Sequence, residues 1–107
     1  MAEERTFTPT MRMASAARRG LRLREKFGRG GTDVGVARAQ QLAAREPVSE
    51  ADVQSMHSYF ARHEVDKTTK THRWNSDSDP SAGFVAWLLW GGDAGKKWAD
   101  SKAGKLG

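Results

Sequence analysis

The first periodic segment, from about Pro9 to Phe27, repeats apolar and small residues at the 3.6-residue interval of an α-helix. Its apolar arc consists of Met13, Ala16, Ala17, Gly20, Leu21, Leu23 and Phe27. The opposite arc carries Arg12, Arg18, Arg19, Arg22, Lys26 and Arg29. Arg24 lies toward the apolar side, so we expect its guanidinium to reach solvent or a carboxylate. The pattern predicts a helix with one basic face.

The stretch "GRGGT", residues 28–32, follows this helix. Glycine tolerates the left-handed backbone of a helix C-cap, so Gly28, Gly30 and Gly31 are predicted to end the helix. Successive backbone amides after Gly30, followed by a helix start, could also form an anion-binding nest. However, no Gly-Lys-Ser or Gly-Lys-Thr follows, and the Rossmann fingerprint needs a preceding strand. We expect a turn between two helices, with phosphate contact as the alternative.

A second helix is predicted to begin near Thr32 or Asp33, either of which can cap it, and to run to about Glu46. Its apolar arc consists of Gly35, Val36, Ala39, Leu42 and Ala43. Because these residues are mostly small, we expect close packing against a neighbouring helix. Arg38 and Arg45 are expected on the outer face.

A third helix is predicted from about Ser49 to Val65, after Pro47 has stopped the second one. Ser49 is the expected N-cap, with Asp52 at the third helical position as an acidic relative of the capping box. One face of this helix carries Val53, Met56, Tyr59, Phe60 and His63.

The helical period ends after Val65. Residues 66–80 contain two apolar residues at most and predict an exposed loop of unusual length. Ser81 then opens the apolar helix "AGFVAWLLW", the "GGDAG" turn interrupts it, and a short helix from about Asp93 to Lys102 brings Trp98 to the core. No segment alternates convincingly as a strand.

These elements predict an all-α fold: a single small domain of four or five short helices with one long polar loop. The helical domain is expected to span residues 9–103 and to contain the 66–80 loop. Residues 1–8 are expected to be a flexible N-terminus, and residues 104–107 a frayed tail.

Composition narrows the class of protein. The chain has 107 residues, 37% of them hydrophobic, enough for one modest core. It has no cysteine, which excludes disulfides, thiolate metal sites and cysteine nucleophiles. The opening "MAEERTFTPT" lacks the pattern of a signal peptide, and "FVAWLLW" falls far short of the roughly 20 apolar residues that cross a bilayer. We therefore expect a soluble, intracellular protein without a membrane partner.

The net charge of +5 is concentrated in the first half of the chain. Residues 1–46 carry ten Lys or Arg against five Asp or Glu, whereas residues 47–107 carry eight of each. Between Arg12 and Arg29 there are seven basic residues and a single acid, Glu25. A solvated face usually mixes signs, so this local excess indicates a polyanion partner.

Catalytic and metal-binding patterns are weak. His57 and His63 are six residues apart, whereas helical metal ligands are best spaced by three or four. His63 is instead expected to be a hydrogen-bonded core histidine, with Glu64 or Asp66 as partner. The serines have capping or surface explanations, and there is no Gly-x-Ser-x-Gly elbow. We therefore predict no enzyme activity, no catalytic or metal-binding residues and no cofactor.

Three blocks carry a resemblance to a known family: "GRGGTDVGVARAQQL", "SYFARHEVDK" and "SAGFVAWLLWGGDAGKKWA". Together they resemble a small domain family found in tailed bacteriophages and other aquatic viruses, over about residues 15 to 99. The sequence departs from the family in the polar link "KTTKTHRWNSDSD", where its members vary most. The resemblance implies viral origin, with a location in the host cytoplasm or the virion, and no particular chemistry.

Two functions remain open. The first is a small basic nucleic-acid-binding protein that contacts the phosphate backbone, largely independently of sequence, with DNA favoured over RNA. Its predicted contact residues are Arg12, Arg18, Arg19, Arg22, Lys26, Arg29, Gly30, Gly31, Arg38, Arg73, Trp74, Lys96 and Lys97. Among these, Trp74 is the expected base-stacking side chain. The alternative is a virion structural or assembly module, in which the arginines bind an acidic head or assembly protein and "FVAWLLW" helps form the interface.

Overall fold

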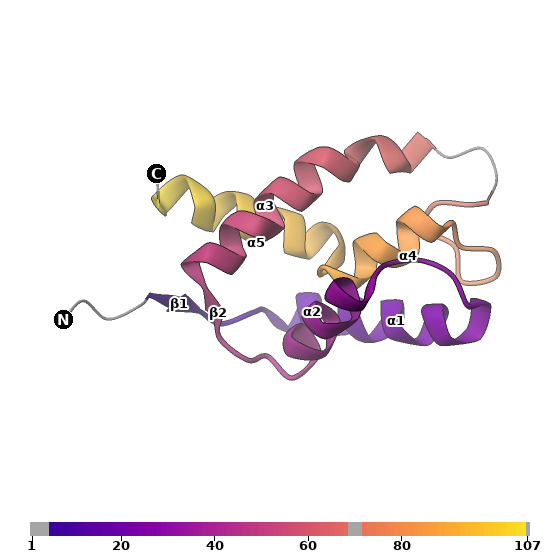
Figure 1. The fold of residues 1–107 in the computed structure, drawn as a ribbon, viewed down its shortest axis with the longest axis horizontal. Helices are drawn as coiled ribbons and strands as arrows, with labels where there is room; N and C mark the ends of the chain where they lie inside the picture. The colour runs from indigo at the N-terminus through magenta and orange to yellow at the C-terminus, as the bar shows by residue number, and fades with distance from the viewer. Residues whose placement is uncertain (1–4, 69–71, 107) are drawn as a thin grey trace.

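The computed structural model describes residues 5–68 and 72–106; for residues 105 and 106 it describes the backbone alone. The described residues form five α-helices, one short 3-10 helix and a two-stranded ladder (Figure 1). In chain order the elements are β1 (Thr6–Phe7), α1 (Met11–Phe27), α2 (Asp33–Ala43), β2 (Val48–Ser49), α3 (Glu50–His63), η1 (Glu64–Thr68), α4 (Ala82–Leu89) and α5 (Gly92–Leu106). The predicted all-α class is confirmed. Residues 1–4, 69–71 and Gly107, and the expectations that fall on them, lie outside the described residues.

Helix α4 is the central element of the core. It contacts α1, α2, α3 and α5, and lies between α1 and α3 in Figure 1. Its buried side chains are Phe84, Val85, Trp87, Leu88 and Leu89. A helix that is apolar on all sides is stable only when neighbours surround it. The "FVAWLLW" segment is therefore inside the domain, as the core prediction states, and of its residues only Ala86 and Trp90 are half-buried. In the described part of the chain, no helix has both the length and the apolar character that crossing a membrane requires.

Side-chain caps set the starts of four helices. The hydroxyls of Thr10, Thr32, Ser49 and Ser81 each accept a hydrogen bond from the backbone amide three residues later, at 3.1–3.3 Å. The predicted caps of the second and third helices and of the apolar helix are thus confirmed. Helix α2, however, ends at Ala43 rather than near Glu46, because Arg45 adopts a left-handed backbone with φ of 54°.

The described residues near the two chain ends, 5–8 and 104–106, include regular secondary structure. Thr6 and Phe7 pair antiparallel with Ser49 and Val48, and the Phe7 ring lies edge-to-face against Trp98. Such short strands carry no alternation that sequence reasoning could detect. Helix α5 continues to Leu106, so the described part of the expected frayed tail is helical.

The polar stretch 66–80 is also partly structured. Its first residues belong to η1, and the later ones fold into a turn in which the Arg73 amide donates to the Asp79 carbonyl at 2.9 Å. The half-buried Trp74 ring lies edge-to-face against Phe84 and Trp87, with ring centroids 5.1 and 5.4 Å away. Residues 72–80 are mostly exposed and contain no helix, as the loop prediction states, but Trp74 packs against the core and Pro80 is buried.

Gly20 sets the distance between α1 and α4. A Cβ added there would lie 2.9 Å from both Leu88 Cβ and the Leu89 amide nitrogen. We expect Gly20→Ala to destabilise the protein by about 1–2 kcal/mol, since overpacking outweighs the better helix propensity of alanine. Thermal unfolding followed by circular dichroism measures this.

The matched control is Gly104→Ala in α5, where an added Cβ meets nothing within 4 Å. Only the propensity gain applies there, so this variant should be more stable by about 0.5–1 kcal/mol. Equal stabilisation by both substitutions would contradict the close approach of α1 and α4.

Candidate nucleic-acid interface

Helix α1 presents a basic face to solvent. It buries Met13, Ala14, Ala17, Gly20 and Leu23 against its neighbours. On the other side, the side chains of Arg12, Arg18, Arg22 and Lys26 are exposed, as predicted. Among the described residues, none of these four has a carboxylate within ion-pair distance; Arg18 donates instead to the Ala43 carbonyl at 3.1 Å. Four uncompensated cations therefore share one side of a single helix.

Two other arginines predicted for this face are already paired. Arg19 Nε lies 2.8 Å from Asp77 Oδ1, and its guanidinium stands over the Phe84 ring. Arg29 Nη1 lies 3.5 Å from Asp79 Oδ1 and donates to the Pro80 carbonyl at 2.9 Å. Both partners belong to the turn after residue 71, so this turn covers part of the basic surface.

Asp79 is the most highly connected carboxylate of that turn. Besides Arg29, it binds His72, whose Nδ1 lies 2.8 Å from Asp79 Oδ1. The hydrogen bond with His72 is the main cause that lowers the pKa of Asp79, and the Arg29 guanidinium adds to it. Asp79 therefore stays ionised and holds Arg29 in place.

The glycine stretch is a turn between α1 and α2, as predicted. Gly28, Gly30 and Gly31 have left-handed φ of 64°, 94° and 78°. The turn also presses on α4, since a Cβ on Gly30 would lie 2.5 Å from Val85 Cβ. Arg24 Nε donates to the Gly30 carbonyl at 3.0 Å, so a backbone oxygen takes the place of the expected carboxylate. Backbone conformation and close packing are sufficient reasons for these glycines.

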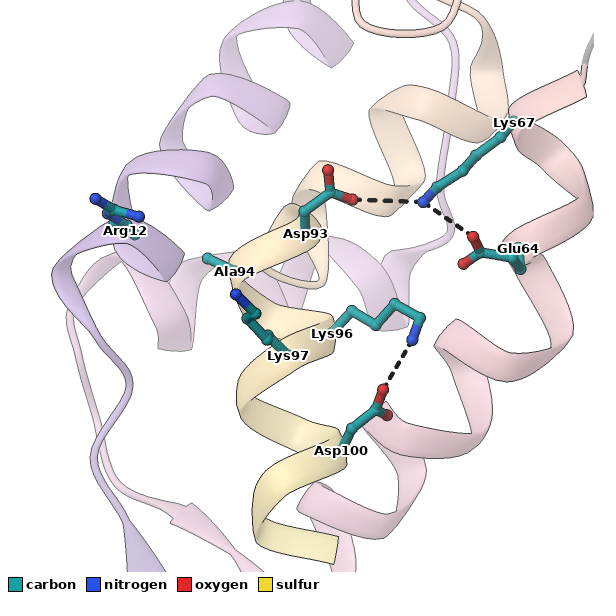
Figure 2. A pocket seen from close by; sticks show the side chains of 8 residues that line it. All are labelled: Arg12, Glu64, Lys67, Asp93, Ala94, Lys96, Lys97 and Asp100. Carbon is teal, nitrogen blue, oxygen red and sulfur yellow. Dashed lines mark hydrogen bonds and ion pairs between the residues drawn. The ribbon is translucent and has the colours of Figure 1, made fainter.

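A groove of about 520 Å³ brings α1 together with α5 and η1, the 3-10 helix that follows α3 (Figure 2). It is lined by Arg12, Glu64, Lys67, Asp93, Ala94, Lys96, Lys97 and Asp100. Inside it, Lys67 lies 3.0 Å from Glu64 and 3.6 Å from Asp93. Lys96 forms a 2.8 Å ion pair with Asp100, which raises the pKa of Lys96. Arg12 and Lys97, which are distant in sequence, also line this groove and have no ion-pair partners in the described structure.

Arg38 does not lie on the outer face of α2. Its side chain is only 11% exposed, and Nη1 lies 3.1 Å from Asp52 Oδ2 and 2.6 Å from Gln41 Oε1. The hydrogen bond from Arg38 is the main cause that lowers the pKa of Asp52. Arg38 also stacks on Trp90, so it joins α2 to α3 and α4. The expectation of an outward-facing Arg38 is wrong, because its planar guanidinium finds three partners inside the fold.

The two predicted nucleic-acid contacts in the turn after residue 71 differ in their exposure to solvent. Arg73 is exposed, whereas the neighbouring Trp74 ring faces the core and is not the free stacking platform that the sequence indicates. His63 binds Asp66 at 3.0 Å, one of its expected partners, but its side chain is 41% exposed rather than in the core. Within residues 5–68 and 72–106, no three potential metal ligands gather at one place.

Sequence reasoning missed the role of Lys67. Its ammonium lies 4.7 Å from the centre of the Trp87 ring, in addition to its two ion pairs. The sequence does contain a signal, because Lys67 follows Glu64 by three residues, a spacing at which side chains on a helix form ion pairs. The prediction of a loop from residue 66 left this signal unused.

The fold and this surface define a small all-α domain with a basic helix face. No family model, curated protein or solved structure matches the chain.

Proposed function

We propose that this protein binds nucleic acid through the phosphate backbone, largely independently of sequence, with DNA as the favoured partner. The observation that carries the proposal is the row of Arg12, Arg18, Arg22 and Lys26, exposed on α1 without carboxylate partners in the described structure. Arginine suits this role because its guanidinium can bind two phosphate oxygens at once.

The dimensions of the row fit a duplex. At 1.5 Å per residue, the fourteen steps from Arg12 to Lys26 span about 21 Å, over which B-DNA presents about twelve phosphate charges. Lys97, which lines the same groove as Arg12, extends the positive surface onto α5. Contacts of this kind position a protein on DNA without reading its bases. Because the Trp74 ring packs against Phe84 and Trp87, we expect base stacking to contribute less to binding than the sequence indicates.

The proposal includes a viral origin, with a location in the host cytoplasm or the virion, because the three sequence blocks resemble a domain family of tailed bacteriophages and aquatic viruses. A role in virion assembly is the alternative, in which the same arginines meet an acidic protein. The burial of Trp87, Leu88 and Leu89 removes the apolar interface that this alternative included. Nucleic acid is therefore the partner that the exposed surface favours.

The test is to change Arg12, Arg18 and Arg22 together to glutamine. Each lost phosphate contact should flatten the slope of log affinity against log salt by about 0.9, so the triple variant should lose about 2–3 in slope on duplex DNA. Gel mobility shift or fluorescence anisotropy at several salt concentrations measures the slope. The three side chains lie outside the core, so the melting temperature should change little.

Arg62→Gln supplies a charge-matched control for Arg22→Gln. Arg62 is exposed on α3 and, like Arg22, has no ion-pair partner in the described part of the chain. Arg22→Gln should flatten the slope and Arg62→Gln should leave it unchanged. An equal effect of both substitutions would mean that net charge, and not the α1 face, governs binding.

A further inference from the structure

The turn formed by residues 72–81 places a carboxylate on the basic face of α1. Asp77 Oδ1 lies 2.8 Å from Arg19 Nε, and Asn75 Oδ1 lies 3.4 Å from Arg19 Nη1. These oxygens engage two of the guanidinium nitrogens that a phosphate would use. Arg19 follows Arg18 and lies one helical turn before Arg22, so it sits within the row of exposed bases.

We propose that Asp77 is an internal competitor for phosphate at Arg19, so that the turn lowers the affinity of the α1 face for nucleic acid. The inference rests on the proposed function and adds a regulation of that same site. A carboxylate offers the same kind of charge-assisted acceptor as a phosphate oxygen, so the two compete for the Arg19 Nε donor.

The exposure of the pair makes this competition reversible. The Asp77 side chain is 70% exposed, whereas that of Arg19 is 29% exposed and held over the Phe84 ring. An exposed ion pair contributes little to stability, so a polyanion can displace the carboxylate. Arg19 itself remains positioned by the ring after the carboxylate leaves.

The backbone of the turn is anchored independently of Asp77. Trp74 packs against Phe84 and Trp87, Pro80 is buried, and the Arg73 amide binds the Asp79 carbonyl. Phosphate can therefore displace the Asp77 carboxylate from Arg19 by a movement of the Asp77 side chain alone, while the turn keeps its backbone contacts. The consequence is a graded reduction in affinity rather than an on-off switch.

The experiment is to substitute Asp77→Asn and measure binding to a 20-base-pair duplex of arbitrary sequence at several salt concentrations. Affinity should rise about two- to five-fold, the range that one exposed ion pair represents. The log–log salt slope should steepen by up to about 0.9, because Asp77 no longer keeps phosphate away from Arg19 in part of the complexes. Asp77 has no buried contact to lose, and circular dichroism checks that the fold is unchanged.

Glu50→Gln is the matched control, since it adds the same charge and breaks another exposed pair, Arg5–Glu50, at 3.5 Å. It should raise affinity less and leave the slope unchanged. The effect of Asp77→Asn should also disappear in an Arg19→Gln background.

Three results would overturn the inference. Asp77→Asn could behave like Glu50→Gln, or it could keep its effect without Arg19; in either case the proposed function would stand while the competition would not. Absence of binding by the parent and by Asp77→Asn at low salt would remove the proposed function, and the inference with it.

Discussion

Trp87→Ala is expected to lower the free energy of unfolding by about 3–5 kcal/mol, the cost of truncating a large buried aromatic residue. The Trp87 side chain is 1% exposed and lies edge-to-face against Phe60, with ring centroids 4.8 Å apart. Its indole nitrogen donates to Asp93 Oδ1 at 2.9 Å, and Lys67 stacks over the ring. The substitution therefore opens a cavity where α3, α4 and α5 meet.

Differential scanning calorimetry would show this as a fall in Tm of more than about 12 °C, at about 4 °C or more per kcal/mol for a domain of this size. Trp87→Phe is the control, because it keeps one aromatic ring and loses only part of the buried ring volume together with the hydrogen bond to the exposed Asp93. It should cost less than half as much. If Trp87→Ala melts with the parent, α4 is not the centre of the core.

Gly30→Val is expected to cost about 2–5 kcal/mol through two separate effects. The backbone at Gly30 has φ of 94°, where an L-residue pays roughly 1–2 kcal/mol and a β-branched one more. A Cβ there would also lie 2.5 Å from Val85 Cβ and 2.8 Å from the Ala82 carbonyl oxygen. Overpacking of this kind adds about 1–3 kcal/mol.

Gly28→Asn separates the two effects. Gly28 is left-handed as well, with φ of 64°, but an added Cβ there meets nothing within 4 Å. Asparagine tolerates this backbone region, so the variant should stay close to the parent in urea unfolding. If Gly30→Val keeps the stability of the parent but loses DNA binding, a phosphate-binding nest would be favoured over the packed turn.

The helical parts of this fold could be predicted because their signals are local. Period, capping hydroxyls and glycines lie within a few residues of the feature that they determine, and Ser49, Ser81 and Gly28 all act as predicted. The two-residue ladder and the course of residues 72–80 could not be predicted. Each depends on a contact between distant segments, such as Phe7 with Trp98 or Trp74 with Phe84.

The same limit applies to the candidate site. The sequence locates the basic face, because all its residues lie on one helix. It does not show that Asp77 and Asp79, 58 and 50 residues away, reach Arg19 and Arg29. Nor does it show that Arg38 turns inward to Asp52. A charge count along the chain therefore overestimates the cations available to a partner.

The central claim is tested most directly by the salt dependence of DNA binding by the unmodified protein. If Arg12, Arg18, Arg22 and Lys26 each contact a phosphate, log affinity should fall against log salt with a slope of about −3 to −4 on duplex DNA, at 0.9 per contact. Two duplexes of unrelated sequence should give the same slope and similar affinities, since phosphate contacts read no bases. Absence of binding to duplex or single-stranded nucleic acid at low salt would contradict the account and leave the basic face of α1 to an acidic protein partner.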